Sequence, residues 1–126
     1  MSIITVGDRV RASYKSGEYI GEVVELTERK ASVKVLAVLK HPVQGDLHYP
    51  LKADVAFFHQ RKALAYREVV MVPLPVVVFF TGEVPAYEDS LRRAWEAEVR
   101  AVSGQSEYAA RALQELQELR KNYFFG

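Results

Sequence analysis

Three histidines and the two aspartates between them are the residues of this sequence whose types fit a metal site. His41, His48 and His59 alternate with Asp46 and Asp54, and imidazole with carboxylate is a ligand set that suits several divalent metals. The spacing matches no metal-binding motif, since the sequence has neither a His-Glu-x-x-His pair nor a calcium-loop pattern. We therefore interpret the histidines as residues that hold a tight loop by hydrogen bonds, and we predict no metal and no cofactor.

The segment 57–67, FFHQRKALAYR, interleaves aromatic and basic side chains. This composition stacks on bases and pairs with phosphates in nucleic-acid-binding proteins. The chain as a whole has 17 basic and 16 acidic residues and a net charge of +1, so no strong field attracts a polyanion. Arg61 and Arg67 can instead pair with acidic residues of the same region, which are Asp46, Asp54 and Glu68. We favour this internal cluster, and nucleic-acid binding is the alternative function.

Covalent catalysis has little support in the sequence. The 126 residues include no cysteine, which excludes a thiolate nucleophile, a disulfide, a thiolate zinc site and a lipid-modified cysteine. No serine lies in a Gly-x-Ser-x-Gly elbow, and the seven glycines are dispersed, so no phosphate-binding loop is present. We predict that the protein is not an enzyme.

The elements that must position these residues follow from the hydrophobic periodicity. Between residues 6 and 39, apolar and polar side chains alternate, which is the pattern of half-buried strands. Val10 and Ala12 share one face of the first strand, and Gly21 marks a bulge or a close backbone approach in the second. We expect three short antiparallel strands, at about residues 9–14, 19–26 and 31–39, and from them a small SH3-like barrel.

The chain from residue 41 to residue 80 has two parts. Prolines and a glycine interrupt the alternation in 41–67, which predicts a structured loop. The apolar run 69–80 then predicts one or two strands that complete the barrel, with Leu74 at a sheet edge or a sharp bend between Pro73 and Pro75. We favour burial of this run in the core. If it is exposed instead, it forms a surface for a partner or for a homodimer.

The period becomes helical after residue 85. One apolar stripe is formed by Tyr87, Leu91, Ala94, Trp95, Val99 and Val102, and a second, after a cap at Ser106, by Ala109, Ala112, Leu113, Leu116, Leu119 and Tyr123. These stripes predict a helical hairpin that packs on the barrel. The fold class is thus mainly β with C-terminal α. Residues 1–84 form the barrel with its loop 41–67, and residues 85–126 form the hairpin, in one compact unit.

The middle of the chain carries a dense set of motifs. They are QGDLH at 44–48, ADV at 53–55, FFHQR at 57–61 and ALAYRE at 63–68, with looser matches at 19–22 and 85–92. In these residues the sequence resembles the kinase-associated lipoprotein B (KapB) family. The resemblance implies an SH3-like barrel with added helices. It also implies a non-catalytic accessory protein of a membrane sensor histidine kinase, which feeds the phosphorelay that starts sporulation.

The resemblance also suggests a partner-binding surface. The positions that match the family's motif, taken with the tip of the apolar run, are Asp46, His48, His59, Gln60, Arg61, Arg67 and Leu74. The implied partner is a sensor histidine kinase or another phosphorelay protein. The family name includes a lipoprotein, but this sequence has no cysteine to acylate, and its start, MSIITVGD, lacks a signal-peptide core. We therefore expect a cytoplasmic protein that reaches the membrane only through a partner.

Overall fold

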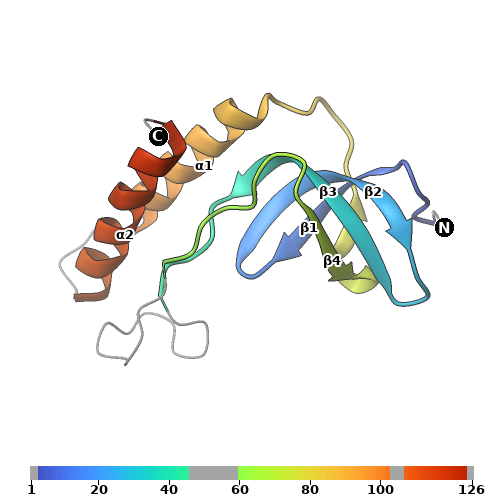
Figure 1. Cartoon of the computed structure of the whole chain (residues 1–126), viewed down its shortest axis with the longest axis horizontal. Coiled ribbons are helices and arrows are strands. Elements are labelled where there is room, and N and C mark those ends of the chain that lie inside the picture. The colour runs from blue at the N-terminus through green and yellow to red at the C-terminus, as the bar shows by residue number, and fades with distance from the viewer. Residues whose placement is uncertain (1–2, 46–59, 103–106, 125–126) are drawn as a thin grey trace.

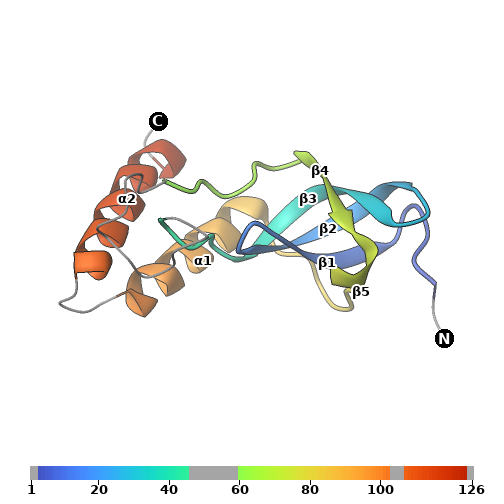
Figure 2. The same ribbon diagram turned by 90° about the horizontal axis from the view of Figure 1, so that it is seen from below.

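The computed structural model describes residues 3–45, 60–102 and 107–124 (Figure 1). A β-sheet occupies one end of the molecule and a pair of helices the other, as Figures 1 and 2 both show. The elements in chain order are β1 (Arg9–Tyr14), β2 (Gly17–Leu26), β3 (Lys30–Lys40), β4 (Val69–Pro73), the 3-10 helix η1 (Leu74–Val76), β5 (Val77–Phe79), α1 (Tyr87–Ala101) and α2 (Glu107–Phe124).

The sheet has five antiparallel strands in the order β4-β3-β2-β1-β5. The antiparallel strands and the two C-terminal helices confirm the coarse prediction from sequence. The predicted closure into a barrel is not found, because the edge strands β4 and β5 pair with β3 and β1 and not with each other. The chain turns between them through η1, which follows Pro73 and contains Pro75, and a proline nitrogen cannot extend a ladder. The SH3-like description stays a prediction.

Alternation along the strands decides which side chains enter the core of the sheet. Val10, Ala12 and Val33 are buried together, because successive side chains of a strand point to opposite faces. The register shifts between Ile20 and Gly21. A Cβ atom at Gly21 would collide with the Val33 side chain and lie 2.6 Å from the carbonyl oxygen of Lys34. The predicted bulge with a close backbone approach at Gly21 is therefore confirmed.

The apolar run 69–80 forms two strands, but only part of it is core. Val72 is fully buried, whereas Val69, Met71 and Val78 are 51%, 53% and 53% exposed. The favoured burial of the whole run is therefore wrong for its outward half. The physical reason is that β4 and β5 are the edge strands, and no described segment covers these three side chains.

The two helices pack on each other and on the rest of the chain. Leu91 and Ala94 of α1 join a cluster with Val35 and Val38 of β3. On α2, Ala112 and Leu116 are fully buried in a cluster that also includes Trp95 of α1, and the Trp95 indole N–H donates to the Leu116 carbonyl at 2.7 Å. Both predicted helices are confirmed, while the predicted cap at Ser106 lies outside the described residues. Neither described helix is long and apolar enough to span a bilayer.

Candidate functional site

Two segments, 41–45 and 60–68, lead from the sheet toward the helix pair, and we call them the neck (Figure 1). They hold three of the predicted site residues, Gln60, Arg61 and Arg67. The other predicted residues of the loop, Asp46, His48 and His59, lie outside the described residues. The neck has little regular secondary structure, so its backbone polar groups need side-chain partners.

Gln44 supplies such partners for the second neck segment. Its side chain is 1% exposed. Its amide NH2 donates to the carbonyls of Arg61 at 2.9 Å and Pro42 at 3.0 Å, and its amide oxygen accepts from the Arg61 N–H at 2.9 Å. The Gln44 carbonyl in turn accepts from the Tyr108 hydroxyl of α2. Gln44 therefore takes the place of a paired strand and fixes the position of Arg61.

His41 links the first neck segment to α2. It is 1% exposed, with Nδ1 at 2.9 Å from the Pro42 carbonyl oxygen and Nε2 at 2.8 Å from the Tyr123 hydroxyl. The Tyr123 oxygen also accepts the Ala63 N–H at 2.8 Å. In this arrangement Nδ1–H donates to Pro42 and Nε2 accepts from Tyr123. The predicted bracing role is confirmed for His41, because both ring nitrogens are engaged. The described residues contain no cluster of metal-binding side chains.

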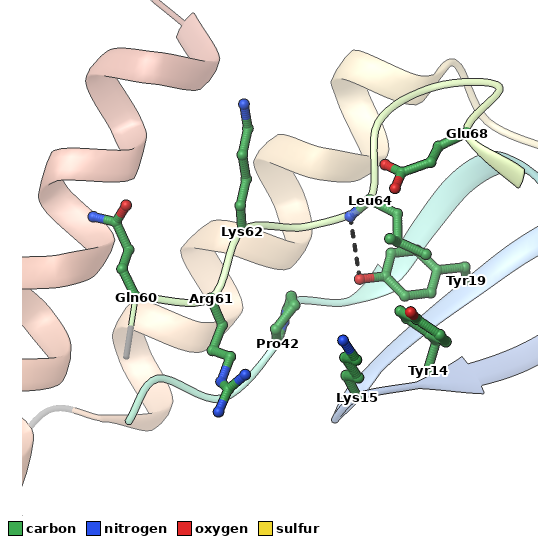
Figure 3. Close-up of a pocket in the computed structure, with 9 residues that line it drawn as sticks. All are labelled: Tyr14, Lys15, Tyr19, Pro42, Gln60, Arg61, Lys62, Leu64 and Glu68. Atoms are coloured by element: carbon green, nitrogen blue, oxygen red, sulfur yellow. Dashed lines mark hydrogen bonds between the residues drawn. The ribbon is translucent and has the colours of Figure 1, made fainter. Parts of the chain in front are cut away.

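Two more tyrosines hold Leu64 of the second neck segment. The Tyr19 hydroxyl accepts the Leu64 N–H at 3.3 Å (Figure 3), and the Tyr87 hydroxyl donates to the Leu64 carbonyl. Burial, with smaller effects of neighbouring groups, raises the pKa of Tyr19 to about 12 and that of Tyr87 to about 12. These hydroxyls stay protonated at neutral pH, so they act as structural hydrogen-bonding groups and not as bases.

The three described neck residues of the prediction differ in what they contact. The Gln60 amide donates to Glu118 of α2 at 3.2 Å. The Arg61 Nε donates to the Gly45 carbonyl at 3.3 Å. The exposed Arg67, in the left-handed region at φ 71°, places its guanidinium 5.8 Å from the Tyr66 ring centroid. Among the described residues, neither Arg61 nor Arg67 forms the expected ion pair with Glu68, whose carboxylate accepts the Ala65 N–H. Their other expected partners, Asp46 and Asp54, lie outside the described residues.

Leu74, the last predicted site residue, lies outside the neck. Its N–H donates to the Arg29 carbonyl just before β3, whereas the first neck segment begins at the other end of β3 and the second ends just before β4. A five-residue strand such as β4 spans about 17 Å, and it separates Leu74 from the second neck segment. Leu74 is partly buried against the core of the sheet, and Pro73 and Pro75 beside it are exposed. The predicted residues therefore do not form one continuous site.

Two buried polar residues of α1 were missed by the sequence reading. The Ser90 hydroxyl accepts the Val38 N–H at 2.9 Å and donates to the Tyr87 carbonyl at 2.7 Å, which ties α1 to β3. Glu98 is 8% exposed and lies 4.0 Å from the Lys40 ammonium. Burial raises the pKa of Glu98, and the Lys40 charge opposes that shift. The signal for Ser90 is its place one residue before the buried Leu91. Glu98 has no comparable signal.

Comparison with known proteins now decides the family. The sequence family described as Kinase associated protein B matches residues 14–124. The chain belongs to this family. It is 49% identical over 126 residues to the kinase-associated lipoprotein B of Bacillus subtilis (strain 168), with 98% of each sequence covered. The X-ray crystal structure of kinase-associated protein B from Bacillus cereus is 38% identical, with a TM-score of 0.82, and covers 96% of this chain and 98% of that one.

The family match confirms the resemblance found in the sequence. It covers both neck segments and both helices, including His41, Gln44 and Tyr123. The similarity to the Bacillus cereus structure extends over almost the whole chain. The arrangement of sheet, neck and helix pair is therefore shared between this chain and the Bacillus cereus member of the family.

Proposed function

We propose that this protein is a non-catalytic accessory protein of a sensor histidine kinase, which acts by protein–protein contact in the phosphorelay that starts sporulation. The observation that carries the proposal is the 49% identity, over nearly the full length, to a protein named as kinase-associated. The site supports it, because the buried groups of the neck are used to hold backbone. His41, Gln44 and Tyr19 are each committed to hydrogen bonds within the fold.

The contact surface that we propose runs from the neck onto β4. Arg67 and Tyr66 are exposed at the end of the neck, and Val69 and Met71 are exposed on the strand that follows. Exposed apolar side chains beside a cation are typical of protein-binding surfaces. The loop residues Asp46, His48 and His59 and the neck residues Gln60 and Arg61 belong to the same proposal, because they are matched to the family's motif. Leu74 contributes a separate contact at the other end of the sheet.

The remaining features of the proposal concern organisation and place. Residues 1–84 and 85–126 form one compact unit, because Ser90, Tyr87 and Tyr123 of the helices bond to β3 and the neck. The strand order and the η1 turn support an SH3-like class for the sheet. We place the protein in the cytoplasm, at the membrane through its kinase partner. A homodimer through the exposed face of β4 is the alternative use of that surface.

The test is recovery of the partner together with function in cells. Purified wild-type protein is used to capture partners from a Bacillus subtilis lysate. Wild type and each variant are used in the same capture experiment. Each is also expressed in a strain that lacks the kinase-associated lipoprotein B relative, and sporulation is scored. Arg61→Glu and Arg67→Glu are the test variants. Arg93→Glu is the matched control, because Arg93 is exposed on α1, which carries none of the proposed contact residues.

We expect to recover a histidine kinase or another phosphorelay protein with wild type and with Arg93→Glu, and clearly less of it with the two neck variants. Folded neck variants that recover the kinase and restore sporulation as well as wild type would overturn the proposed surface. Recovery of nucleic acid alone, released by moderate salt, would instead favour nucleic-acid binding, since phosphate contacts weaken steeply with salt.

A further inference from the structure

A small open pocket lies where the β1–β2 turn meets the neck (Figure 3). Its volume is about 280 Å³, below the usual range for drug-sized ligands but sufficient for one small polar group. The residues that line it are Tyr14, Lys15, Tyr19, Pro42, Gln60, Arg61, Lys62, Leu64 and Glu68. Three of these side chains are cationic and one is acidic, so the lining is positive even though the protein is almost neutral.

The cations of this pocket have no acidic partner in the described part of the chain. The described ion pairs join Arg11 to Glu18, Lys34 to Glu22 and Lys40 to Glu98. Lys15, Arg61 and Lys62 take part in none of them. Glu68, the acidic residue of the lining, accepts the Ala65 N–H and closes its own turn. The described residues therefore leave the positive charge of the pocket uncompensated.

The backbone of the β1–β2 turn positions Lys15, the first of the pocket cations. Lys15 is in the left-handed region at φ 45°, which costs about 1 kcal/mol for a residue with a side chain. Its ammonium lies 5.4 Å from the Tyr14 ring centroid. The Ser16 hydroxyl accepts the Val43 N–H at 2.9 Å and so ties this turn to the neck. Lys15 is therefore held beside the pocket at some cost to the free protein.

Arg61 is held in place by hydrogen bonds of its backbone and of one side-chain atom. The Gln44 side chain binds both the N–H and the carbonyl of Arg61, and the Arg61 Nε donates to the Gly45 carbonyl. The terminal guanidinium nitrogens of Arg61 donate to no group in the described part of the chain. Lys15 and Arg61 both line the pocket and lie below the second neck segment in Figure 3, on either side of Pro42, while Lys62 extends upward away from both. Lys15 and Arg61 are thus the contact groups, and Lys62 adds only positive charge.

We propose that this pocket binds an oxyanion, a carboxylate or a phosphate group, through the Lys15 ammonium and the terminal nitrogens of Arg61. A guanidinium whose two terminal nitrogens bind no described group matches the geometry of either anion, and charge-assisted hydrogen bonds of this kind are among the strongest in proteins. The source of the anion is the protein partner, which is the part that rests on the proposed function. The affinity of the pocket itself does not depend on that function.

The test is a titration of purified full-length protein with inorganic phosphate, followed by amide NMR shifts and compared with sodium chloride at equal ionic strength. The variants are Lys15→Gln and Arg61→Gln. The matched control is Lys30→Gln, because Lys30 is exposed at the start of β3, at the opposite end of the sheet from the β1–β2 turn. Thermal unfolding of each variant is measured first. Lys15→Gln removes an exposed side chain and leaves the fold intact, so the test does not depend on Arg61→Gln.

We expect saturable phosphate shifts at Lys15, Arg61 and Leu64, with affinity about tenfold weaker in each pocket variant and unchanged in Lys30→Gln. Shifts that chloride reproduces, or equal losses in Lys15→Gln and Lys30→Gln, would overturn the proposal.

A peptide of aspartate and glutamate, compared with its asparagine and glutamine counterpart, identifies the source of the oxyanion. If the acidic peptide displaces phosphate and its asparagine and glutamine counterpart does not, the result supports the pocket with a carboxylate as its ligand. Phosphate binding that resists the acidic peptide supports the pocket with a phosphate group as its ligand. No kinase is present in this titration, so failure to recover a kinase and failure to bind an oxyanion are separate results.

Discussion

Acid should destabilise this protein through the buried His41. His41 is 1% exposed and bonded to the Pro42 carbonyl and to the Tyr123 hydroxyl of α2. The pKa of His41 is lowered from 6.5 to about 4, mainly by burial; the Pro42 hydrogen bond opposes this shift and the Lys40 charge adds to it. Protonation would add a charge in a buried position and remove the acceptor that the Tyr123 hydroxyl uses.

The sign and size of the effect follow from linkage. The folded-state pKa of His41 lies below the unfolded value, so the unfolded chain takes up the proton first. The contribution of His41 to stability is therefore complete above pH 6.5 and is lost as the pH falls toward about 4. One pKa unit corresponds to about 1.4 kcal/mol, so this shift is worth up to about 3 kcal/mol of unfolding free energy.

Urea unfolding measured from neutral pH down to pH about 4 tests this expectation in wild type and His41→Gln. Glutamine can donate to Pro42 and accept from Tyr123 without titrating. Glu98 acts in the opposite direction, because its raised pKa favours the folded state in acid, but it is present in both proteins. The wild-type free energy should therefore fall toward that of the variant as the pH drops. A constant difference across this range would refute the reasoning.

Three further predictions concern packing and cooperativity. Gln44→Ala should lower the unfolding free energy by about 3 kcal/mol in urea titrations, because three hydrogen bonds are lost and the Arg61 backbone is left unpaired. As a control, Gln60→Ala at an exposed position should cost less than about 1 kcal/mol. Equal losses in the two variants would contradict the role of Gln44 in the neck. Gly21→Ala should cost about 1–3 kcal/mol by overpacking, measured in the same way, and a neutral result would mean that β3 can move. Thermal unfolding followed by Trp95 fluorescence and by circular dichroism should give one midpoint, whereas two midpoints would show that the helix pair and the sheet unfold separately.

Local patterns were enough to find most elements of the fold. The alternation in 9–14 and 31–39 predicted which side chains face the core, because a strand turns successive residues to opposite sides. The apolar stripes in 87–102 and 109–123 predicted the two helices correctly, because apolar side chains recur at a fixed period along one face of a helix. The exposure of Val69 and Met71 was missed, because periodicity cannot tell an edge strand from a central one.

The functional surface could be predicted only in part. The motif residues Gln60 and Arg61 do lie together in the neck, since they are adjacent in the chain. Leu74, chosen from local sequence, lies at the far end of β3. Lys15 was not predicted as a site residue, because its place in the same pocket as Arg61 depends on how the β1–β2 turn folds against the neck.

The sequence by itself determined the family, the strand-rich first part, the two helices and the absence of cysteine chemistry, because each is written in composition, in local periodicity or in motifs. Only the tertiary structure decided what the polar residues do. His41 meets Tyr123, Gln44 meets Arg61, and Ser90 meets the backbone of Val38. Hydrogen bonds act over a few ångströms between groups that are far apart in the chain, so no local pattern records them until the chain has folded.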